Sequence, residues 1–252
     1  NMVKPNKSLG QHFLNDESVI LEISELIKQS FIGERILEIG PGMGALTKYI
    51  IKDFPEILQC VELDQRCVND LLVKFPNLAG RILMGDFLQM PNKMMFEQQT
   101  TLVGNFPYNI SSQIIFKAIE NYENIPVVVG MFQKEVAERF AAKPGNKTYG
   151  VTSVLTQLYY DVSIAFHISP DKFDPPPKVM SSIIVLKRKT NIPTADFKKL
   201  KTAVKGAFSQ RRKKMRNALS GIFSPEILEE PIFQKRAEEL SLEDFLILSE
   251  RL

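Results

Sequence analysis

A glycine-rich turn that directly follows a buried strand is the feature that most constrains the fold of this 252-residue chain. The run Arg35–Ile39 is apolar enough to be a central strand, and Gly40, Gly42 and Gly44 follow it at once. Glycine at these positions lets the backbone turn sharply and approach a ligand with no Cβ in the way. A strand, such a turn and a helix form the first unit of a doubly wound α/β sheet.

Strand and helix patterns alternate through the first two thirds of the chain. Runs typical of buried strands occupy 59–63, 81–84, 101–103 and 127–129, with apolar residues at helical spacing at 19–27 and 114–122. This alternation predicts an α/β fold with a mostly parallel sheet and helices on both faces. Two more runs, 162–168 and 182–186, suit an antiparallel pair that closes one edge of the sheet.

The pattern changes near residues 188–193, after which only helical signals remain. We therefore predict two domains, residues 1–189 and a small all-α domain of residues 190–252. In the second, Thr194 is expected to cap the first helix, and the last helix is expected to begin near Ser241.

Charge is distributed unevenly, although the net charge is only +3. The segment from Lys187 to Arg216 holds twelve Lys or Arg residues and one acidic residue, Asp196. Such an excess in one region indicates a polyanionic partner. Within it, Arg211, Arg212, Lys213 and Lys214 with Arg216 open a predicted helix, and they are the candidates for RNA phosphate contacts. A solvated basic face is the alternative.

Several other classes of protein are disfavoured. The longest apolar run, 126–132, is too short to span a bilayer, and no signal-peptide pattern precedes the first motif. Cys60 and Cys67 match no zinc pattern, so we expect two buried thiols and no metal. A cytoplasmic monomer is the expectation.

Acidic residues at the ends of the second and third strands suggest a nucleoside site. Glu62 can accept both hydroxyls of a ribose, and Asp86 can accept an adenine amino proton with Phe87 against the ring. Each has a simpler interpretation, a solvent-facing carboxylate for Glu62 and a helix cap for Asp86. The turn 40–45 also fits the loose dinucleotide pattern, so an NAD oxidoreductase is an alternative, although no acid or base for hydride transfer is placed.

The segment Asn105-Phe106-Pro107-Tyr108 follows the fourth strand and would line the same crevice. The Asn105 side-chain oxygen and the Phe106 carbonyl can each accept a hydrogen bond from the N6 amine of adenine. Pro107 stiffens the backbone, and Tyr108 offers a face on which a base turned out of its helix can stack. With the upstream sites, this predicts methyl transfer from S-adenosylmethionine (SAM) to adenine. A plain strand-to-helix turn is the alternative.

The chain resembles the ribosomal RNA adenine N6-dimethyltransferases, most closely their small-subunit (16S) group. The resemblance runs nearly end to end. Ser8–Leu14 is similar to S-x-G-Q-N-F-L with His12 where Asn is usual, 38–47 to E-I-G-x-G-x-G-x-L-T, and 105–108 to N-L-P-Y with Phe for Leu. The segments 132–139, 173–179 and 208–213 also look like family signatures.

The resemblance implies a Rossmann-like, class I methyltransferase with a seven-stranded sheet. It implies SAM contacts from the following positions: His12, Leu14, Gly40, Glu62, Asp86 and Asn105. The departure at His12 puts its side-chain contact in doubt. Phe173 is a candidate second wall of the base slot, with a core aromatic residue as the alternative.

By the same resemblance, the substrate is two adjacent adenines in a small-subunit rRNA hairpin, methylated during ribosome biogenesis on a pre-30S particle. Two alternatives remain open. One is an antibiotic-resistance type of large-subunit rRNA methyltransferase, and the other is an RNA-binding assembly factor with dispensable catalysis.

Overall fold

The computed structural model describes residues 3–252, which divide into two units. The described part of the first, the sheet unit, comprises residues 3–137 and 163–188; the second, the helical unit, comprises 138–162 and 189–252. This division differs from the predicted one, because residues 138–162 group with the C-terminal segment although most of them precede the last two strands of the sheet. The break at 188/189 lies one residue from the predicted 189/190.

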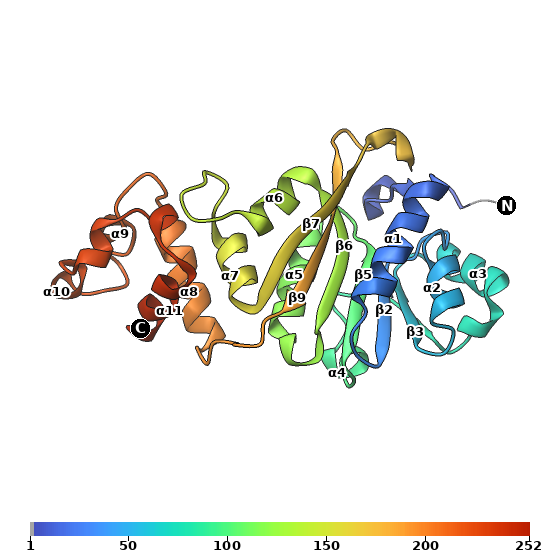
Figure 1. The fold of residues 1–252 in the computed structure, drawn as a ribbon, viewed down its shortest axis with the longest axis horizontal. Helices are drawn as coiled ribbons and strands as arrows, with labels where there is room; N and C mark the ends of the chain where they lie inside the picture. Colours follow the sequence, from blue (N-terminus) through green and yellow to red (C-terminus); the bar gives the residue numbers. More distant parts are fainter. Residues whose placement is uncertain (1–2) are drawn as a thin grey trace. The chain divides into compact units, whose positions relative to one another are not determined.

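A mostly parallel seven-stranded sheet organises the first unit, as predicted (Figure 1). The strands, in order across the sheet, are β4 (Ile82–Met84), β3 (Leu58–Glu62), β2 (Arg35–Ile39), β5 (Thr100–Asn105), β6 (Val127–Gln133), β9 (Ser181–Arg188) and β7 (Tyr160–Ile168). The first five are parallel, and β9 is antiparallel to β6. The two late runs therefore form strands at one end of the sheet, with β7 at the edge.

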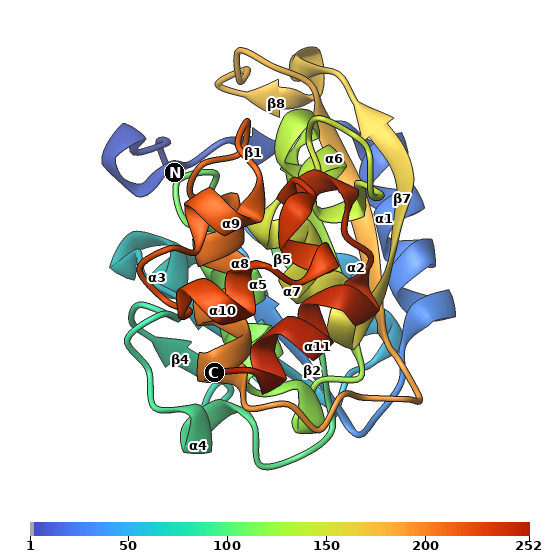
Figure 2. The ribbon, with the colours of Figure 1, turned by 90° about the vertical axis from the view of Figure 1, so that its left-hand side faces the viewer.

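Strand order reverses between β2 and β5. The chain moves from β2 to β3 in one direction and from β5 to β6 in the other. Right-handed crossovers in opposite directions place their helices on opposite faces of a sheet. Accordingly α1 (Glu17–Ser30) and α2 (Thr47–Asp53) cover one face, and α5 (Ser111–Glu120) covers the other (Figures 1 and 2).

The sheet unit has several further elements. They are α3 (Gln65–Lys74), α4 (Asn92–Met95), the first part of α6 (Lys134–Ala141), the two-residue strands β1 (Phe13–Leu14) and β8 (Phe173–Asp174), and the 3-10 turns η1 (Lys7–Leu9), η2 (Pro76–Leu78), η3 (Tyr122–Asn124) and η4 (Pro170–Lys172). The strands β1 and β8 pair with each other, antiparallel. This small ladder fastens the N-terminal segment to the segment that precedes β9.

Apolar side chains of the central strands form the core. Every residue of β2 is buried, as is every residue of β5 except Asn105, its last. α1 buries Ile20, Ile23 and Ile27 on one side, at the spacing that the sequence predicted, and Asp16 caps its N-terminus. The carboxyl ends of the parallel strands therefore project from a rigid base.

The helical unit comprises α7 (Val151–Tyr159), α8 (Phe197–Phe208), α9 (Met215–Ala218), α10 (Pro225–Leu228), α11 (Leu242–Glu250), the second part of α6, and the 3-10 turns η5 (Pro231–Gln234) and η6 (Ala237–Glu239). Ser241 caps α11, as predicted. The predicted Thr194 cap is wrong, because the Asp196 carboxylate accepts the amides of Lys198 and Lys199 instead. Within residues 3–252 no helix has the length and apolar character needed to cross a bilayer.

Candidate active site

A cavity of about 400 Å³ opens at the carboxyl ends of β2, β3, β4 and β5, where the strand order reverses. Its volume lies in the usual range for small-molecule sites, about 300–1,000 Å³. It brings together every predicted cofactor and catalytic residue: His12, Leu14, Gly40, Gly42, Glu62, Asp86, Phe87, Asn105, Phe106, Pro107 and Tyr108. All of these belong to the sheet unit.

The glycine turn has the backbone that its sequence predicts. Gly40 and Gly42 have φ values of 65° and 57°, in the left-handed region that disfavours side chains. A Cβ on Gly42 would lie 3.1 Å from the Phe13 ring. A side chain would thus be strained at both positions and also crowded at Gly42, and the turn presents bare backbone to the cavity.

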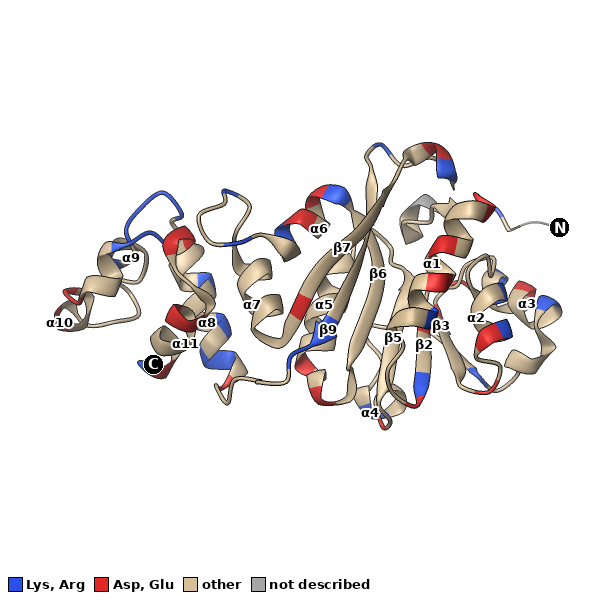
Figure 3. Cartoon of the chain, in the orientation of Figure 1, with Lys and Arg blue, Asp and Glu red and all other residues tan. Residues whose placement is uncertain are grey.

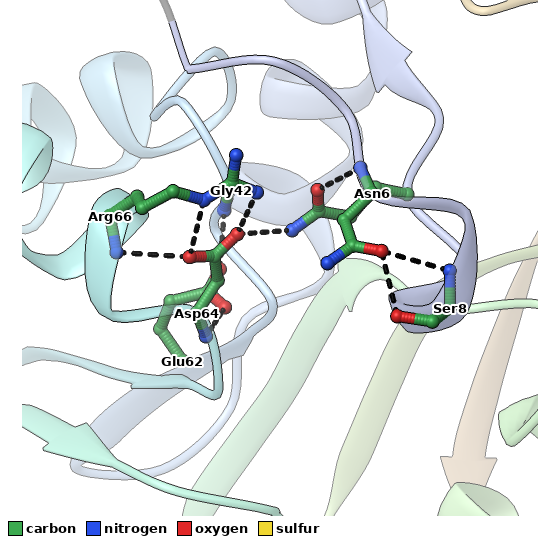
Figure 4. Close-up of polar contacts among 7 residues, drawn as sticks. Asn6, Ser8, Gly42, Glu62, Asp64 and Arg66 are labelled. Carbon is green, nitrogen blue, oxygen red and sulfur yellow. Dashed lines mark hydrogen bonds and ion pairs between the residues drawn. The ribbon is translucent and has the colours of Figure 1, made fainter.

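Glu62 holds this turn in place (Figure 4). Its Oε1 accepts the Gly42 amide at 2.9 Å, and its Oε2 accepts the Asp64 amide at 2.9 Å. Burial raises the pKa of Glu62, and the two amide hydrogen bonds oppose that shift. Because each carboxylate oxygen has a second acceptor position, Glu62 can still accept ribose hydroxyls while it braces the turn.

Glu38 is a cavity residue for which the sequence predicted no separate role. It lies in the middle of β2, is 2% exposed, and accepts the Thr47 hydroxyl at 2.5 Å. Burial raises its pKa to about 7. The signal in the sequence was a carboxylate in a buried central strand, a costly placement that usually has a purpose. A cationic ligand in the cavity would favour its ionised form.

The loop after β4 supplies Asp86 and Phe87. Asp86 Oδ1 accepts the Leu88 amide at 2.9 Å, so part of this carboxylate caps a turn. This differs from the helix cap that was the simpler interpretation, because α4 begins only at Asn92. The Phe87 ring is 3% exposed and packs edge-on against Phe96, with ring centroids 6.2 Å apart. One wall of the cavity is thus an aromatic ring beside a carboxylate.

Asn105 is held by the N-terminal segment. Its Nδ2 donates to the His12 carbonyl at 3.0 Å. This hydrogen bond uses the amide nitrogen and leaves the amide oxygen for the acceptor role that the sequence predicted. This contact of His12 with the turn Asn105–Tyr108 uses its backbone carbonyl and does not depend on the side chain at position 12.

Phe106 anchors the turn in the core. Its ring is 1% exposed and packs edge-on against Phe132, with centroids 5.4 Å apart. Gly104 and Gly130 make room for it, since a Cβ on Gly130 would lie 2.3 Å from the ring. The side chain is thus structural, which leaves the backbone carbonyl for the acceptor role.

Tyr108 has partners on two sides. Its hydroxyl hydrogen-bonds with Ser181, and the His12 ring stacks on it with centroids 5.5 Å apart and an interplanar angle of 26°. Burial raises the pKa of Tyr108. His12 Nδ1 is in turn 2.8 Å from the Pro175 carbonyl. In this arrangement the His12 ring covers one face of the tyrosine.

The N-terminal segment is also tied to the end of β3. Gln11 Nε2 donates to Asp64 Oδ2 at 3.0 Å, and the Asn6 amide donates to Gln11 Oε1 at 2.7 Å. Figure 4 shows Asp64 between this segment and Arg66, whose side chain lowers the pKa of Asp64 to about 2. The segment is therefore fastened on both sides of the cavity.

Phe173 does not line the cavity. It pairs with Leu14 in the β1–β8 ladder, is 2% exposed and packs in the hydrophobic core. Its neighbour Asp174 lines the cavity instead, because successive side chains of a strand point in opposite directions. The structure thus matches the alternative of a core aromatic residue.

The basic cluster, defined as Arg211, Arg212, Lys213, Lys214 and Arg216, lies in the helical unit. Its first four residues lie between α8 and α9, and Arg216 lies in α9 (Figure 3). Arg212, Lys213, Lys214 and Arg216 are exposed. Arg211 makes contacts within the helical unit: it donates to the Asn146 carbonyl at 3.3 Å and forms an ion pair with Glu238 at 3.8 Å. The cluster precedes and enters the helix it was expected to open, with Lys214 at the N-cap.

Within residues 3–252, no group of three or more His, Cys, Asp or Glu side chains is placed to hold a metal ion. Cys60 and Cys67 are both buried and unpaired by disulfide.

Comparisons with known proteins agree along the chain. A model of the family described as ribosomal RNA adenine dimethylase matches residues 2–252. The ribosomal RNA small subunit methyltransferase A of Cytophaga hutchinsonii is 46% identical over 253 residues, covering 99% of this chain and 98% of that protein. The Parabacteroides distasonis protein of the same name is 45% identical over 251 residues, covering 98% and 94%.

Solved structures are similar over the same length. A dimethyladenosine transferase from Plasmodium falciparum has a TM-score of 0.78 and 26% identity, covering 94% of this chain and 96% of that one. The 23S rRNA methyltransferase ErmE has a TM-score of 0.68 and 23% identity, covering 95% and 99%. The second likeness concerns the fold alone.

Proposed function

Because the chain belongs to the ribosomal RNA adenine dimethylase family, we propose that it dimethylates the N6 amines of two adjacent adenines in a small-subunit rRNA hairpin. The family makes it a methyltransferase with SAM as its cofactor. The observation that carries the proposed chemistry is the hydrogen bond from Asn105 Nδ2 to the His12 carbonyl. Because this bond fixes the orientation of the side-chain amide, it also fixes the position of the Asn105 oxygen as an acceptor.

The cavity fits the cofactor in its donor set. We assign the ribose of SAM to Glu62 and its adenine to Asp86 and Phe87. The bare backbone of the glycine turn lets the cofactor approach the chain closely. The buried Glu38 carboxylate suits the positive charge of the ligand. When bound, SAM supplies a methyl group on a sulfonium, so the protein needs no nucleophile of its own.

The catalytic turn orients the adenine amine. The Asn105 oxygen and the Phe106 carbonyl each accept a hydrogen bond from one of its two N–H groups, which draws the nitrogen lone pair out of conjugation with the ring. Tyr108 holds the base by stacking. Fixed donors and acceptors in a buried site need no reorganisation during reaction, and alignment of this kind is a major source of rate.

We assign RNA contact to the exposed part of the basic cluster, Arg212, Lys213, Lys214 and Arg216, with Arg211 as its support. In this proposal the sheet unit is the catalytic domain and the helical unit is the RNA-binding domain. Phosphate contacts of this kind add affinity but little sequence choice. The natural substrate would be a pre-30S particle in the cytoplasm, with the enzyme acting as a monomer.

The test is to incubate the protein and SAM with small and large ribosomal subunits that lack these methyl groups. N6,N6-dimethyladenine blocks base pairing, so reverse transcription should stop at two adjacent adenines of the small-subunit RNA. Asn105→Ala should abolish these stops while it retains RNA binding, and Asn69→Ala, an exposed residue of α3, should behave as the wild type. Stops only in large-subunit RNA would show the resistance-type activity, and no stops in either would refute the proposal.

A further inference from the structure

Lys117 is a lysine in the interior of the sheet unit. It lies on α5, the helix that follows the catalytic turn, and it is only 9% exposed. The neighbouring buried residues of α5 include Ile114, Ala118 and Ile119. Burial lowers the pKa of Lys117, while Asp86 and Glu120 oppose that shift. Burying an ammonium group costs several kcal/mol unless it gains partners, and an apolar side chain would fill the same space without that cost.

The partners of this ammonium group all lie in one loop. Nζ donates to the carbonyls of Phe87 and Met90, the second at 2.8 Å. It also lies 4.8 Å from the centroid of the Phe87 ring, within range of a cation–π interaction. Two hydrogen bonds and one ring contact thus join the Lys117 ammonium group to the Asp86–Met90 loop.

That loop is part of the cavity wall. Asp86 and Phe87 line the cavity, and the Asp86 carbonyl accepts the amides of Gln89 and Met90 at 3.0 and 3.1 Å. These local bonds close the loop on itself, but they do not fix where it lies relative to the sheet. The Gly85 amide ties the start of the loop to the Glu62 carbonyl of β3 at 2.9 Å. Lys117 holds the rest of the loop, because it bonds to the carbonyls of Phe87 and Met90 from a helix packed on the sheet.

We propose that Lys117 is a positioning residue for the cofactor, which holds the Asp86–Met90 loop so that Asp86 and Phe87 meet the adenine of SAM. This inference rests on the proposed function, in which that wall of the cavity takes the adenine. In this proposal α5 supports two parts of the site. It holds the Asp86–Met90 loop through Lys117, and it begins three residues after Tyr108, the last residue of the catalytic turn.

The experiment compares Lys117→Met, which removes the donors, with Lys117→Gln, which keeps one amide donor. Lys93→Met, an exposed lysine of α4, is the matched control. Calorimetry with S-adenosylhomocysteine should show affinity reduced about tenfold or more in Lys117→Met, with Lys117→Gln in between. The rate at saturating SAM should stay within about twofold of the wild type, because the catalytic turn keeps its own anchors.

Hydrogen exchange gives a readout that does not depend on activity. In Lys117→Met, amides of the 86–90 loop should exchange faster, while those of β5 keep the wild-type rate. If Lys117→Met does not fold, Lys117→Gln decides.

Asp86→Asn separates the two levels of inference. If it weakens binding while both Lys117 variants bind within about twofold of the wild type, the role of Lys117 is wrong and the proposed function stands. If Asp86→Asn also has no effect, the adenine placement is wrong, and the inference on Lys117 fails with it. A loss of maximal rate with unchanged affinity would equally overturn it.

Discussion

Replacing Glu38 by Gln should make the ligand-free protein more stable at alkaline pH. The pKa of this buried carboxyl is raised from 4.5 to about 7 in the folded state. When a group has a higher pKa in the folded than in the unfolded state, its contribution to stability is fully present below the unfolded pKa. That contribution is lost as the pH rises through the folded pKa. The wild type should therefore lose stability between about pH 4.5 and 7. The full shift corresponds to on the order of 3 kcal/mol.

Glutamine is nearly the same shape and can still accept the Thr47 hydroxyl, but it does not ionise. Urea unfolding of both proteins at pH 5 and pH 8 measures the effect. Relative to the wild type, Glu38→Gln should gain about 2 to 3 kcal/mol more at pH 8 than at pH 5. Glu56→Gln, at an exposed position, controls for the loss of a negative charge. An equal stability difference at the two pH values would refute a raised pKa at Glu38.

Three further outcomes follow from the site and the basic cluster. Glu62→Ala should weaken SAM binding about ten- to a hundredfold by calorimetry, because it removes charge-assisted hydrogen bonds and releases the Gly42 amide; unchanged affinity in a folded variant would contradict the assignment. Gly42→Ala should destabilise the protein more than Gly80→Ala, since both glycines have positive φ but only Gly42 meets a neighbour, Phe13; equal melting temperatures would show that the contact is unimportant. Replacing Arg211, Arg212, Lys213 and Lys214 together by Ser should leave SAM affinity intact and reduce the salt dependence of RNA binding in filter assays. The log–log slope should fall by about 0.7–0.9 for each RNA phosphate that is no longer neutralised. A wild-type slope would place the RNA site elsewhere.

The central sheet was predictable because its strands are short runs of buried apolar residues. β2 begins and ends where the pattern indicated, and β5 and β6 differ only in length. The same applies to α1 and α5, whose apolar residues recur at helical spacing. Local patterns of this kind depend on neighbours in sequence, so a single chain displays them.

What escaped prediction depends on partners distant in sequence. The two-residue ladder of β1 and β8 leaves no periodic pattern, so the burial of Phe173 was not evident. Residues 138–162 were predicted to belong to the first domain because they lie between strands, but Tyr149 donates to the Leu240 carbonyl and joins the C-terminal elements. Lys117 falls among apolar residues of α5, where only the loop opposite explains it.

The prediction for the cap of α8 failed for a local reason. Thr194 and Asp196 are both good N-cap residues, and the pattern of apolar residues that begins at Phe197 fits either. A carboxylate directly before the first helical residue can accept two amides and interacts favourably with the positive end of the helix dipole. Two residues of ambiguity is normal at a helix end.

The slot beneath the catalytic turn has a consequence for how this protein can change over time. The Phe106 ring occupies space that Gly104 and Gly130, on two adjacent strands, leave open. Any side chain at position 130 would push against the ring and move the backbone of Phe106, whose carbonyl we propose as an acceptor for the substrate amine. A smaller residue at 106 would instead leave a void between the strands. Positions 104, 106 and 130 are therefore coupled in evolution: whether a substitution at one of them is tolerated depends on the residues at the other two.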